Sequence, residues 1–464
     1  MHYYRRIEQI LSNLRPAFSR HAAYEWFVVL IWGILLCNGH PAITSYLNAV
    51  GLTPECYSPA LHWFHSKAIS ARTLSLAWHE WLVTHPQVHR LKGQPVYLGD
   101  GIKVSKEGRK MPAVKRLHQE SENVTKAEWI RGHYFGAITL LLEAGSCLFA
   151  VPVTFELQDG IKTTKDDRST VVDKMSGLCT ELINAGSYII LDAYFASKNL
   201  LCEFREYNLH LITRVRINTV AKHPKPAAIK RGRGRPRTWG ESVKLRNLFN
   251  EEESFTRETL PLYGKMVTLK YRSIDLHWDC PHNQVRFVLA VLPEGKQIIL
   301  LSTDVTLSPT EIVTAYSWRF KIEVTFRSFI QLLSGFSYRF WMKEMTETKK
   351  WPIDLILAQH QETKQQLFNR KIEAFERFVL INAIALAILQ LLSLEMPTAI
   401  FKGFPRWFRT LPNHGYPSEQ IVLLTLQENR ERILAKSPSD ILLAKFIAAK
   451  IPPTRPWHLE HFVR

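Results

Sequence analysis

The chain has 464 residues, of which 46% are hydrophobic and 22% are charged, the composition of an ordinary soluble, folded protein. Its length excludes a single small core and predicts several domains, or one core with large insertions. The net charge of +18 favours a polyanionic partner, nucleic acid before an anionic membrane surface, over a merely solvated basic face.

Cysteine spacing and hydropathy exclude further classes. The six cysteines are scattered without any Cys-x-x-Cys pair, which argues against a structural zinc site and a disulfide framework and favours reduced thiols. Two apolar runs, residues 27–37 and 378–392, are short or carry polar side chains, so we interpret them as buried core helices and expect no membrane association. The first ten residues contain no apolar signal-peptide core, which predicts an intracellular protein.

The beginning of the chain predicts helices followed by strands. Residues 1–90 carry apolar side chains at three- and four-residue spacing and are predicted to be helical, either as a packed domain or as a DNA-binding module. Residues 95–105 (PVYLGDGIKVS) predict a strand that contains Asp100. Residues 132–157 predict two strands joined by a turn at 143–146.

The next segment predicts alternating helices and strands. A helix is expected over 166–186, with Ser169 or Thr170 as its N-cap and Gly186 at its end. The elements predicted after it are strand 188–191, helix 197–207 and strand 209–219. This order predicts an α/β domain with a mixed sheet.

The last part of the chain is first β-rich and then helical. Residues 265–275 and 284–304 predict strands, with a hairpin turn at 293–295. One continuous helix is predicted over 309–333, and the last 130 or so residues predict further helices that are aromatic and basic.

A basic region separates these parts. From Arg214 to Arg246, eleven basic residues accompany one acid, Glu241, and prolines and glycines exclude a regular helix. Within it, KRGRGRPR (230–237) contains the Arg-Gly-Arg-Pro core of AT-hook segments, whose extended backbone lets arginines enter a narrow A·T minor groove. A solvated loop with sequence-neutral phosphate contacts fits equally well. Both interpretations make the same side chains face DNA: Lys230, Arg231, Arg233, Arg235 and Arg237.

Deleting residues 230–237 is expected to weaken DNA binding and to flatten its salt dependence, because fewer condensed counterions would be released from the phosphates. The measurement is the slope of log K against log salt for the wild type and the deletion variant. Two equal slopes would contradict this prediction.

Three carboxylates are candidates for chemistry. Asp100 and Asp192 lie in or directly after predicted strands of one sheet, and Glu323 shares a predicted helical face with Tyr316, Arg319 and Arg327. Taken singly, each has an ordinary explanation: an aspartate at a strand end is a turn former, and Glu323 between two arginines forms an exposed ion-pair ladder.

Together the three carboxylates predict phosphodiester chemistry. Mg²⁺ prefers hard oxygen ligands, and two such ions held by carboxylates can activate a hydroxyl nucleophile and stabilise the leaving oxygen. Neighbouring arginines would contact DNA phosphates. The hypothesis also explains how a locally acidic site can occur in a strongly basic chain.

The order Asp100, Asp192, Glu323, with the last inside Tyr316-x-x-Arg319-x-x-x-Glu323, resembles the DDE transposases of bacterial insertion sequences, in particular a cut-and-paste group with a β-strand insertion before the glutamate. Segments such as LGDGIKVSKEGRK, DDRSTVVDKM, LDAYFAS and YSWRFKIEVTF carry this resemblance over residues 95–345. One position departs from the signature: Ile330 stands where the family has a lysine. Two alternatives stay open: Lys321 or Arg327 replaces that phosphate contact, or the contact is absent.

The resemblance implies an RNase H-like catalytic core interrupted by a β-rich insertion and flanked by N-terminal and C-terminal helical regions. The implied division is a helical DNA-binding domain (1–92), core (93–220), insertion with the basic loop (221–305), core with the glutamate helix (306–345) and a C-terminal helical region (346–464). Asp100, Asp192 and Glu323 would be catalytic and bind Mg²⁺, with Mn²⁺ as a substitute. Tyr316, Arg319 and Arg327 would bind DNA.

The implied activity is cleavage at transposon ends followed by strand transfer into target DNA, by a homodimer in a synaptic complex that holds double-stranded terminal inverted repeats. The implied location is the bacterial cytoplasm, at the nucleoid. The alternatives left open are a domesticated DNA-binding relative with weak chemistry and an RNase H-fold nuclease without strand transfer.

Overall fold

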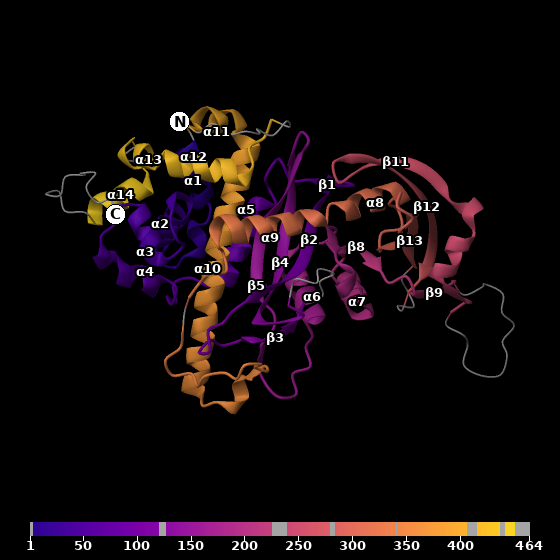
Figure 1. Cartoon of the computed structure of the whole chain (residues 1–464), viewed down its shortest axis with the longest axis horizontal. Helices are drawn as coiled ribbons and strands as arrows, with labels where there is room; N and C mark the ends of the chain where they lie inside the picture. Colours follow the sequence, from indigo (N-terminus) through magenta and orange to yellow (C-terminus); the bar gives the residue numbers. More distant parts are fainter. Residues whose placement is uncertain are drawn as a thin grey trace.

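The computed structural model describes residues 3–119, 127–224, 239–278, 284–339, 341–405, 415–436 and 441–450. It is a mixed α/β protein in which one large sheet lies beside a block of helices (Figure 1). The predicted α/β class is therefore confirmed. The basic segment 230–237 lies outside the described residues, and the predicted domain boundaries stay a prediction.

The helical block combines the two ends of the chain. Its N-terminal helices are α1 (Tyr3–Ser12), α2 (His21–Leu36), α3 (Ile43–Ala49), α4 (Tyr57–Trp63) and α5 (Ala71–Leu82). Its C-terminal helices are α10 (Glu362–Glu395), α11 (Pro397–Gly403), α12 (Glu419–Glu428), α13 (Arg430–Lys436) and α14 (Leu442–Lys450). Helix α10 contacts α2, α5 and α12, so segments more than 300 residues apart share one core (Figure 1).

Helix α10 is buried as a core helix. It is long and apolar enough to cross a membrane by length and composition, but 94% of its most apolar window is buried inside the protein. Its polar side chains have internal partners: Asn382 donates to the Phe378 carbonyl at 2.8 Å and Gln390 donates to Glu419 at 3.1 Å. The interpretation of both apolar runs as core helices is confirmed, since α2 is also largely buried.

The carboxylate of Glu395 joins the N-terminal and C-terminal parts of the helical block. Glu395, at the end of α10, accepts two hydrogen bonds from Arg6 of α1, at 2.6 and 2.7 Å, and contacts His85 at 2.7 Å. Burial opposes the charge of Glu395, but the bonds from Arg6 and His85 outweigh it and hold the pKa of this carboxyl below its usual value. The folded protein therefore favours the charged form.

Replacing Glu395 with glutamine is expected to lower the free energy of unfolding by roughly 1.5–3 kcal/mol at neutral pH, the usual range for hydrogen bonds to a charged group. Because the folded-state pKa is depressed, this contribution is present above the unfolded pKa and is lost as the pH falls through the folded one. Urea titrations at neutral pH and at about pH 3.5 should therefore show the difference between wild type and variant shrinking with acid. A difference independent of pH would contradict the ion-pair explanation.

Within the described residues, the sheet has 13 strands. Its central strands are β2 (Gln94–Ser105), β4 (Trp129–Ala144), β5 (Cys147–Leu157), β7 (Tyr188–Leu191) and β8 (His210–Val215), in the spatial order β5-β4-β2-β7-β8. Strands β2, β4 and β5 pair antiparallel, whereas β7 and β8 run parallel to β2. The helices α6 (Val171–Leu182) and α7 (Lys198–Glu206) make the parallel connections between them. The short strands β1 (Arg90–Leu91) and β3 (Lys115–His118) pair with β2 and β4.

The β-rich segment extends this same sheet. Its strands are β9 (Val220–Lys222), β10 (Ser242–Lys244), β11 (Thr256–Leu262), β12 (Lys265–His277), β13 (Gln284–Val291) and β14 (Gln297–Ser302). Strand β14 pairs antiparallel with β8, from Ile299 opposite Val215 to Ser302 opposite Ile212. The insertion is thus joined to the central strands by continuous backbone hydrogen bonds (Figure 1).

A separate pair, β6 (Ile161–Lys162) and β15 (Leu355–Ile356), runs parallel.

Three local predictions need correction. The helix predicted over 166–186 is shorter, Val171–Leu182, and of the two predicted N-caps Thr170 is the one observed. Gly186 lies beyond this helix and takes a left-handed conformation (φ +84°) in the turn before β7. The predicted turn at 143–146 is shorter, because β4 continues to Ala144. The helix predicted over 309–333 is two helices, α8 (Pro309–Ser317) and α9 (Phe320–Leu333).

Candidate active site

The three predicted carboxylates converge on one cation, Arg319. Its guanidinium lies 3.2 Å from Asp100 (Nη1–Oδ2), 3.9 Å from Asp192 (Nε–Oδ1) and 2.5 Å from Glu323 (Nη2–Oε1). The Arg319 side chain is only 20% exposed, whereas that of Glu323 is 55% exposed. The structure therefore brings together residues that are up to 223 positions apart in a cluster that opens to solvent on the Glu323 side.

Asp100 comes from the middle of β2, where it lies opposite Ala137 of β4. One carboxylate oxygen accepts the amide proton of Gly101 at 2.7 Å. Gly101 is required here, because a Cβ atom at this position would lie 1.8 Å from the hydroxyl of Tyr134. The sequence Asp-Gly within a strand therefore allows Tyr134 to pack directly against the backbone beside the carboxylate.

Asp192 follows the last residue of β7, whose four residues are all buried. The chain then turns through a 3₁₀ segment, Ala193–Phe195, in which Phe195 is buried and Tyr194 is 54% exposed. Thr213 of the neighbouring strand donates its hydroxyl to the Asp192 carbonyl at 3.2 Å. Because β7 runs parallel to β2, this strand end brings Asp192 beside Asp100.

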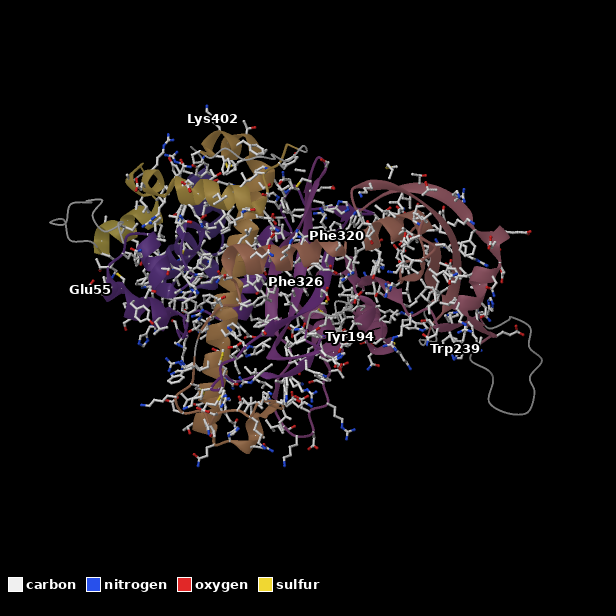
Figure 2. All side chains as sticks on the ribbon, in the orientation of Figure 1. Glu55, Tyr194, Trp239, Phe320, Phe326 and Lys402 are labelled. Atoms are coloured by element: carbon white, nitrogen blue, oxygen red, sulfur yellow. The ribbon has the colours of Figure 1, made fainter. Side chains whose placement is uncertain are left out.

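Glu323 lies in the first turn of α9, which is fixed on β5. The buried Thr325 hydroxyl donates to the Ala150 carbonyl at 2.7 Å, and Phe329 stacks on Phe155 with ring centroids 4.8 Å apart. Phe320 and Phe326 of this helix are labelled in Figure 2, over the central strands. These contacts fix the buried face of α9 on β5 and leave Glu323 on its exposed face.

The break between α8 and α9 places Arg319. Trp318 and Arg319 bond to residues three positions earlier, Ala315 and Tyr316, at 3.0 and 3.2 Å, which is the tighter 3₁₀ pattern. Arg319 and Glu323 still lie four residues apart on one face, as their ion pair shows, and the shared face predicted for Tyr316 and Arg327 stays a prediction. The side chain of Arg319 also contacts Asp100 and Asp192.

The electrostatics of the cluster follow from burial and charge. Burial raises the pKa of the Asp100 carboxyl to about 6, against the opposing effects of Arg319 and the Gly101 amide. Burial disfavours the charge of Arg319, but Asp100, Asp192, Tyr316 and Glu323 together raise the pKa of its guanidinium. Arg319 is therefore a permanent cation surrounded by acids.

The other predicted DNA-binding residues differ in position. Tyr316 lies near Arg319 and Asp192, and burial raises the pKa of its hydroxyl to about 12. Arg327 is exposed on α9 and forms no ion pair with any acid in the part of the chain that the structure describes. Lys321 lies near Cys147 and Glu419, and burial lowers the pKa of its ammonium, while Ile330 is 46% exposed.

Sequence reasoning missed one residue beside the cluster. Tyr263, in the turn between β11 and β12, has φ +52°, and its ring stands edge-on to that of Phe320, with the ring centres 5.4 Å apart. Burial raises the pKa of its hydroxyl, and Arg319, Glu323 and Arg214 are its charged neighbours. The β11–β12 turn thereby reaches helix α9. A two-residue Tyr-Gly turn between strands was visible in the sequence, but its tertiary neighbour was not.

The carboxylate oxygens of the cluster are the type of ligand that a hard divalent cation prefers. Over the described ranges, however, no three His, Cys, Asp or Glu side chains are spaced to hold a metal ion directly. The three carboxylates instead share the guanidinium of Arg319. A metal ion would therefore have to replace this guanidinium.

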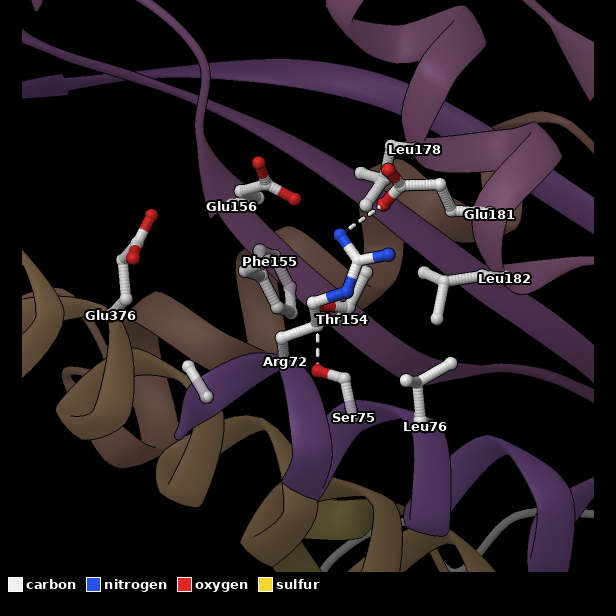
Figure 3. Close-up of a pocket in the computed structure, with 11 residues that line it drawn as sticks. Arg72, Ser75, Leu76, Thr154, Phe155, Glu156, Leu178, Glu181, Leu182 and Glu376 are labelled. Atoms are coloured by element: carbon white, nitrogen blue, oxygen red, sulfur yellow. Dashed lines mark hydrogen bonds and ion pairs between the residues drawn. The ribbon is translucent and has the colours of Figure 1, made fainter. Parts of the chain in front are cut away.

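A cavity of about 150 Å³ lies elsewhere, between α5, β5, α6 and α10 (Figure 3). Its wall contains the ion pair between Arg72 and Glu181 (2.5 Å) and the carboxyl of Glu376, whose pKa burial and the nearby Glu156 raise to about 8. None of the three predicted carboxylates lines it, so the site with the chemistry is an open cluster rather than this cavity.

The fold and site define an α/β protein with a carboxylate cluster where parallel strands end. Residues 164–340 match a family described as the transposase DDE domain, a range that contains Asp192 and Glu323 but not Asp100. The predicted resemblance to DDE transposases is confirmed over this range. No curated protein matches the sequence.

Among solved structures, the piggyBac transposase synaptic complex with hairpin DNA, determined by cryo-EM, is 12% identical. The match covers 96% of this chain and 79% of that chain with a TM-score of 0.34. A likeness of this size supports no conclusion about this chain.

Proposed function

We propose that the chain is a DDE transposase with an RNase H-like core and that Asp100, Asp192 and Glu323 are its catalytic residues. The observation that carries the proposal is their convergence on Arg319 within a chain whose residues 164–340 match the transposase DDE domain family. The strand order β5-β4-β2-β7-β8, with three antiparallel strands followed by two parallel ones, supports the RNase H-like description.

The substrate in this proposal is double-stranded DNA, first at transposon ends and then at a target. Water attacks a phosphodiester at the end and releases a 3′-hydroxyl, and this hydroxyl then attacks a target phosphodiester and displaces another 3′-hydroxyl. Asp100, Asp192 and Glu323 would hold Mg²⁺, or Mn²⁺ as a substitute, which when bound supplies charge stabilisation and a more acidic nucleophile.

The residues around the cluster have separable roles. Arg319, Tyr316 and exposed Arg327 would contact the DNA end, and the segment 230–237 would add phosphate or minor-groove contacts. The net charge of +18 supports a polyanionic substrate. A homodimer in the synaptic complex, an insertion-sequence origin and a nucleoid location in a bacterial cytoplasm complete the proposal.

The test uses purified protein and a duplex that carries the element's own ends, with Mg²⁺ or with EDTA, and scores cleaved and joined products. Metal-dependent cleavage and joining are expected. Cleavage without joining would identify a nuclease of the same fold. Binding without cleavage would identify a DNA-binding relative with weak chemistry, which the exposed Ile330 in place of the signature lysine favours.

A further inference from the structure

Three tryptophans form an exposed surface next to the two chain segments that follow the proposed catalytic elements. Trp341 is 69%, Trp351 42% and Trp129 36% exposed, and Ile353 beside them is 83% exposed. Large apolar side chains gathered on a surface in this way indicate an interaction site. We refer to Trp129, Trp341 and Trp351, with the basic residues around them, as the tryptophan surface.

The tryptophan surface is built on backbone that is held firmly. Residues 106–116 continue from β2, and residues 336–339 and 341–353 follow α9. Backbone bonds join the two segments: Met342 to Lys110 at 2.9 Å, Thr348 to Arg109 at 2.9 Å and Arg116 to Pro352 at 3.1 Å. The Lys106 ammonium also donates to the Phe336 and Tyr338 carbonyls, at 3.0 and 3.3 Å.

Cations lie over the indole rings. The Arg116 guanidinium is 3.8 Å from the ring centre of Trp129 and 5.1 Å from that of Trp351. Lys110 is 5.5 Å from Trp341, and Lys350 is 5.9 Å from Trp351. Such contacts hold positive charges on top of the rings without neutralising them.

The charges of this surface lack acidic partners. In the described part of the chain, Lys110, Arg116, Lys349 and Lys350 form no ion pair, and Arg109 has only a 3.8 Å contact to an exposed Glu347. Unpaired cations alternating with exposed indoles suit a partner that combines anionic groups with flat apolar rings. A single-stranded nucleic acid has both, whereas duplex DNA hides the faces of its bases in the stack.

We propose that the tryptophan surface binds unpaired nucleotides of the DNA strand next to the cleavage site. The segment of this surface nearest to the cleavage site begins directly after Ser105, the last residue of β2. Ser105 lies roughly 17 Å along the extended backbone from Asp100, so one DNA strand can pass from the carboxylates to this segment. The indoles stack on bases through the ring faces that these cations leave open, and the lysines and arginines follow the phosphates. The proposal rests on the proposed function for the identity of the polymer.

The test measures binding of a labelled single-stranded oligonucleotide and of the matching duplex by fluorescence anisotropy in EDTA. The double variant Trp341→Ala, Trp351→Ala is expected to lose about 10-fold to 100-fold of its affinity for the single strand, because each stacked base contributes substantially. Its duplex affinity should change less than about threefold, since phosphate contacts dominate there. The pair Lys349→Gln, Lys350→Gln should lower the single-strand salt slope by about 1.4.

The matched controls are Tyr207→Ala, a 52% exposed aromatic residue, and Lys296→Gln in the turn between β13 and β14; both should bind like the wild type. If the double variant unfolds, Trp341→Ala alone, at the most exposed indole, keeps the test valid. Unchanged single-strand affinity in this variant overturns the proposal. Equal loss for single strand and duplex also overturns it, and so does a change from dimer to monomer in sedimentation.

Failure of this inference is distinguishable from failure of the proposed function. If the wild type cleaves and joins DNA ends and the tryptophan variants keep its single-strand affinity, the proposed function stands and the tryptophan surface is rejected. If the wild type does not cleave DNA but replacing Trp341 and Trp351 lowers the single-strand affinity, the tryptophan surface stands and the proposed function is rejected.

Discussion

Asp192→Asn is expected to reduce DNA cleavage and joining by on the order of 10³-fold or more, as removal of a preorganised charge at a reacting centre commonly does. Asp192 has a 38% exposed side chain and lies at the strand end beside Asp100, where its carboxylate faces the common centre with Glu323. Asparagine keeps the shape and removes the charge. The reduction should therefore appear in the chemical step while the fold is retained.

The assay compares cleaved and joined products with end binding by anisotropy, in one preparation of each variant. DNA affinity should change by less than about threefold, because phosphate contacts from many cations dominate binding. Asp166→Asn, an exposed aspartate before α6, is the matched control and should cleave like the wild type. A variant at Asp192 that retains full cleavage would exclude this carboxylate from the reaction.

The elements of the fold were largely predictable because their signals are local. The strand with Asp100, the buried strand before Asp192 and the capped helix at Thr170 follow from residue alternation and capping chemistry. The pairing of β14 with β8 was not predictable, because the bonds between Ile299 and Val215 depend on tertiary packing. The interruption at Trp318 was missed for the same reason: its indole packs on the ring of His89 at 4.4 Å.

The site was predictable in membership but not in geometry. Asp100, Asp192 and Glu323 were identified through order and family resemblance, and Arg319 was expected to face DNA. Spacing on an ideal helix paired Glu323 with both Arg319 and Arg327, yet only Arg319 forms that ion pair in the described residues. The contacts of Arg319 with Asp100 and Asp192 were also not predictable, because they join residues far apart in the sequence and depend on tertiary packing.

Arg319→Gln is expected to strengthen binding of Mn²⁺ to the DNA-free protein about tenfold, because the guanidinium and the metal ion require the same three carboxylates. The same variant should have a lower Tm in EDTA, since three acids are left without their cation, and Mn²⁺ should restore it. Isothermal titration with Mn²⁺ and thermal unfolding measure both effects without any cleavage assay.

Two further variants separate charge from geometry. Arg327→Gln removes an exposed cation from the same helix and should leave Mn²⁺ affinity unchanged. Arg319→Lys keeps the charge but lacks the planar fork that reaches Asp100, Asp192 and Glu323 together, so it should bind Mn²⁺ with intermediate affinity. Weaker Mn²⁺ binding by Arg319→Gln would instead mean that Arg319 positions the carboxylates for the metal.

The expected order of affinities has a consequence for DNA. If a metal ion displaces the guanidinium, Arg319 becomes available for a phosphate, so metal binding and DNA binding should each strengthen the other. Mn²⁺ should then bind more tightly to wild type with end duplex than without it, and this difference should largely disappear in Arg319→Gln. A coupling that persists in the variant would place its origin in the DNA phosphates themselves, acting as additional metal ligands.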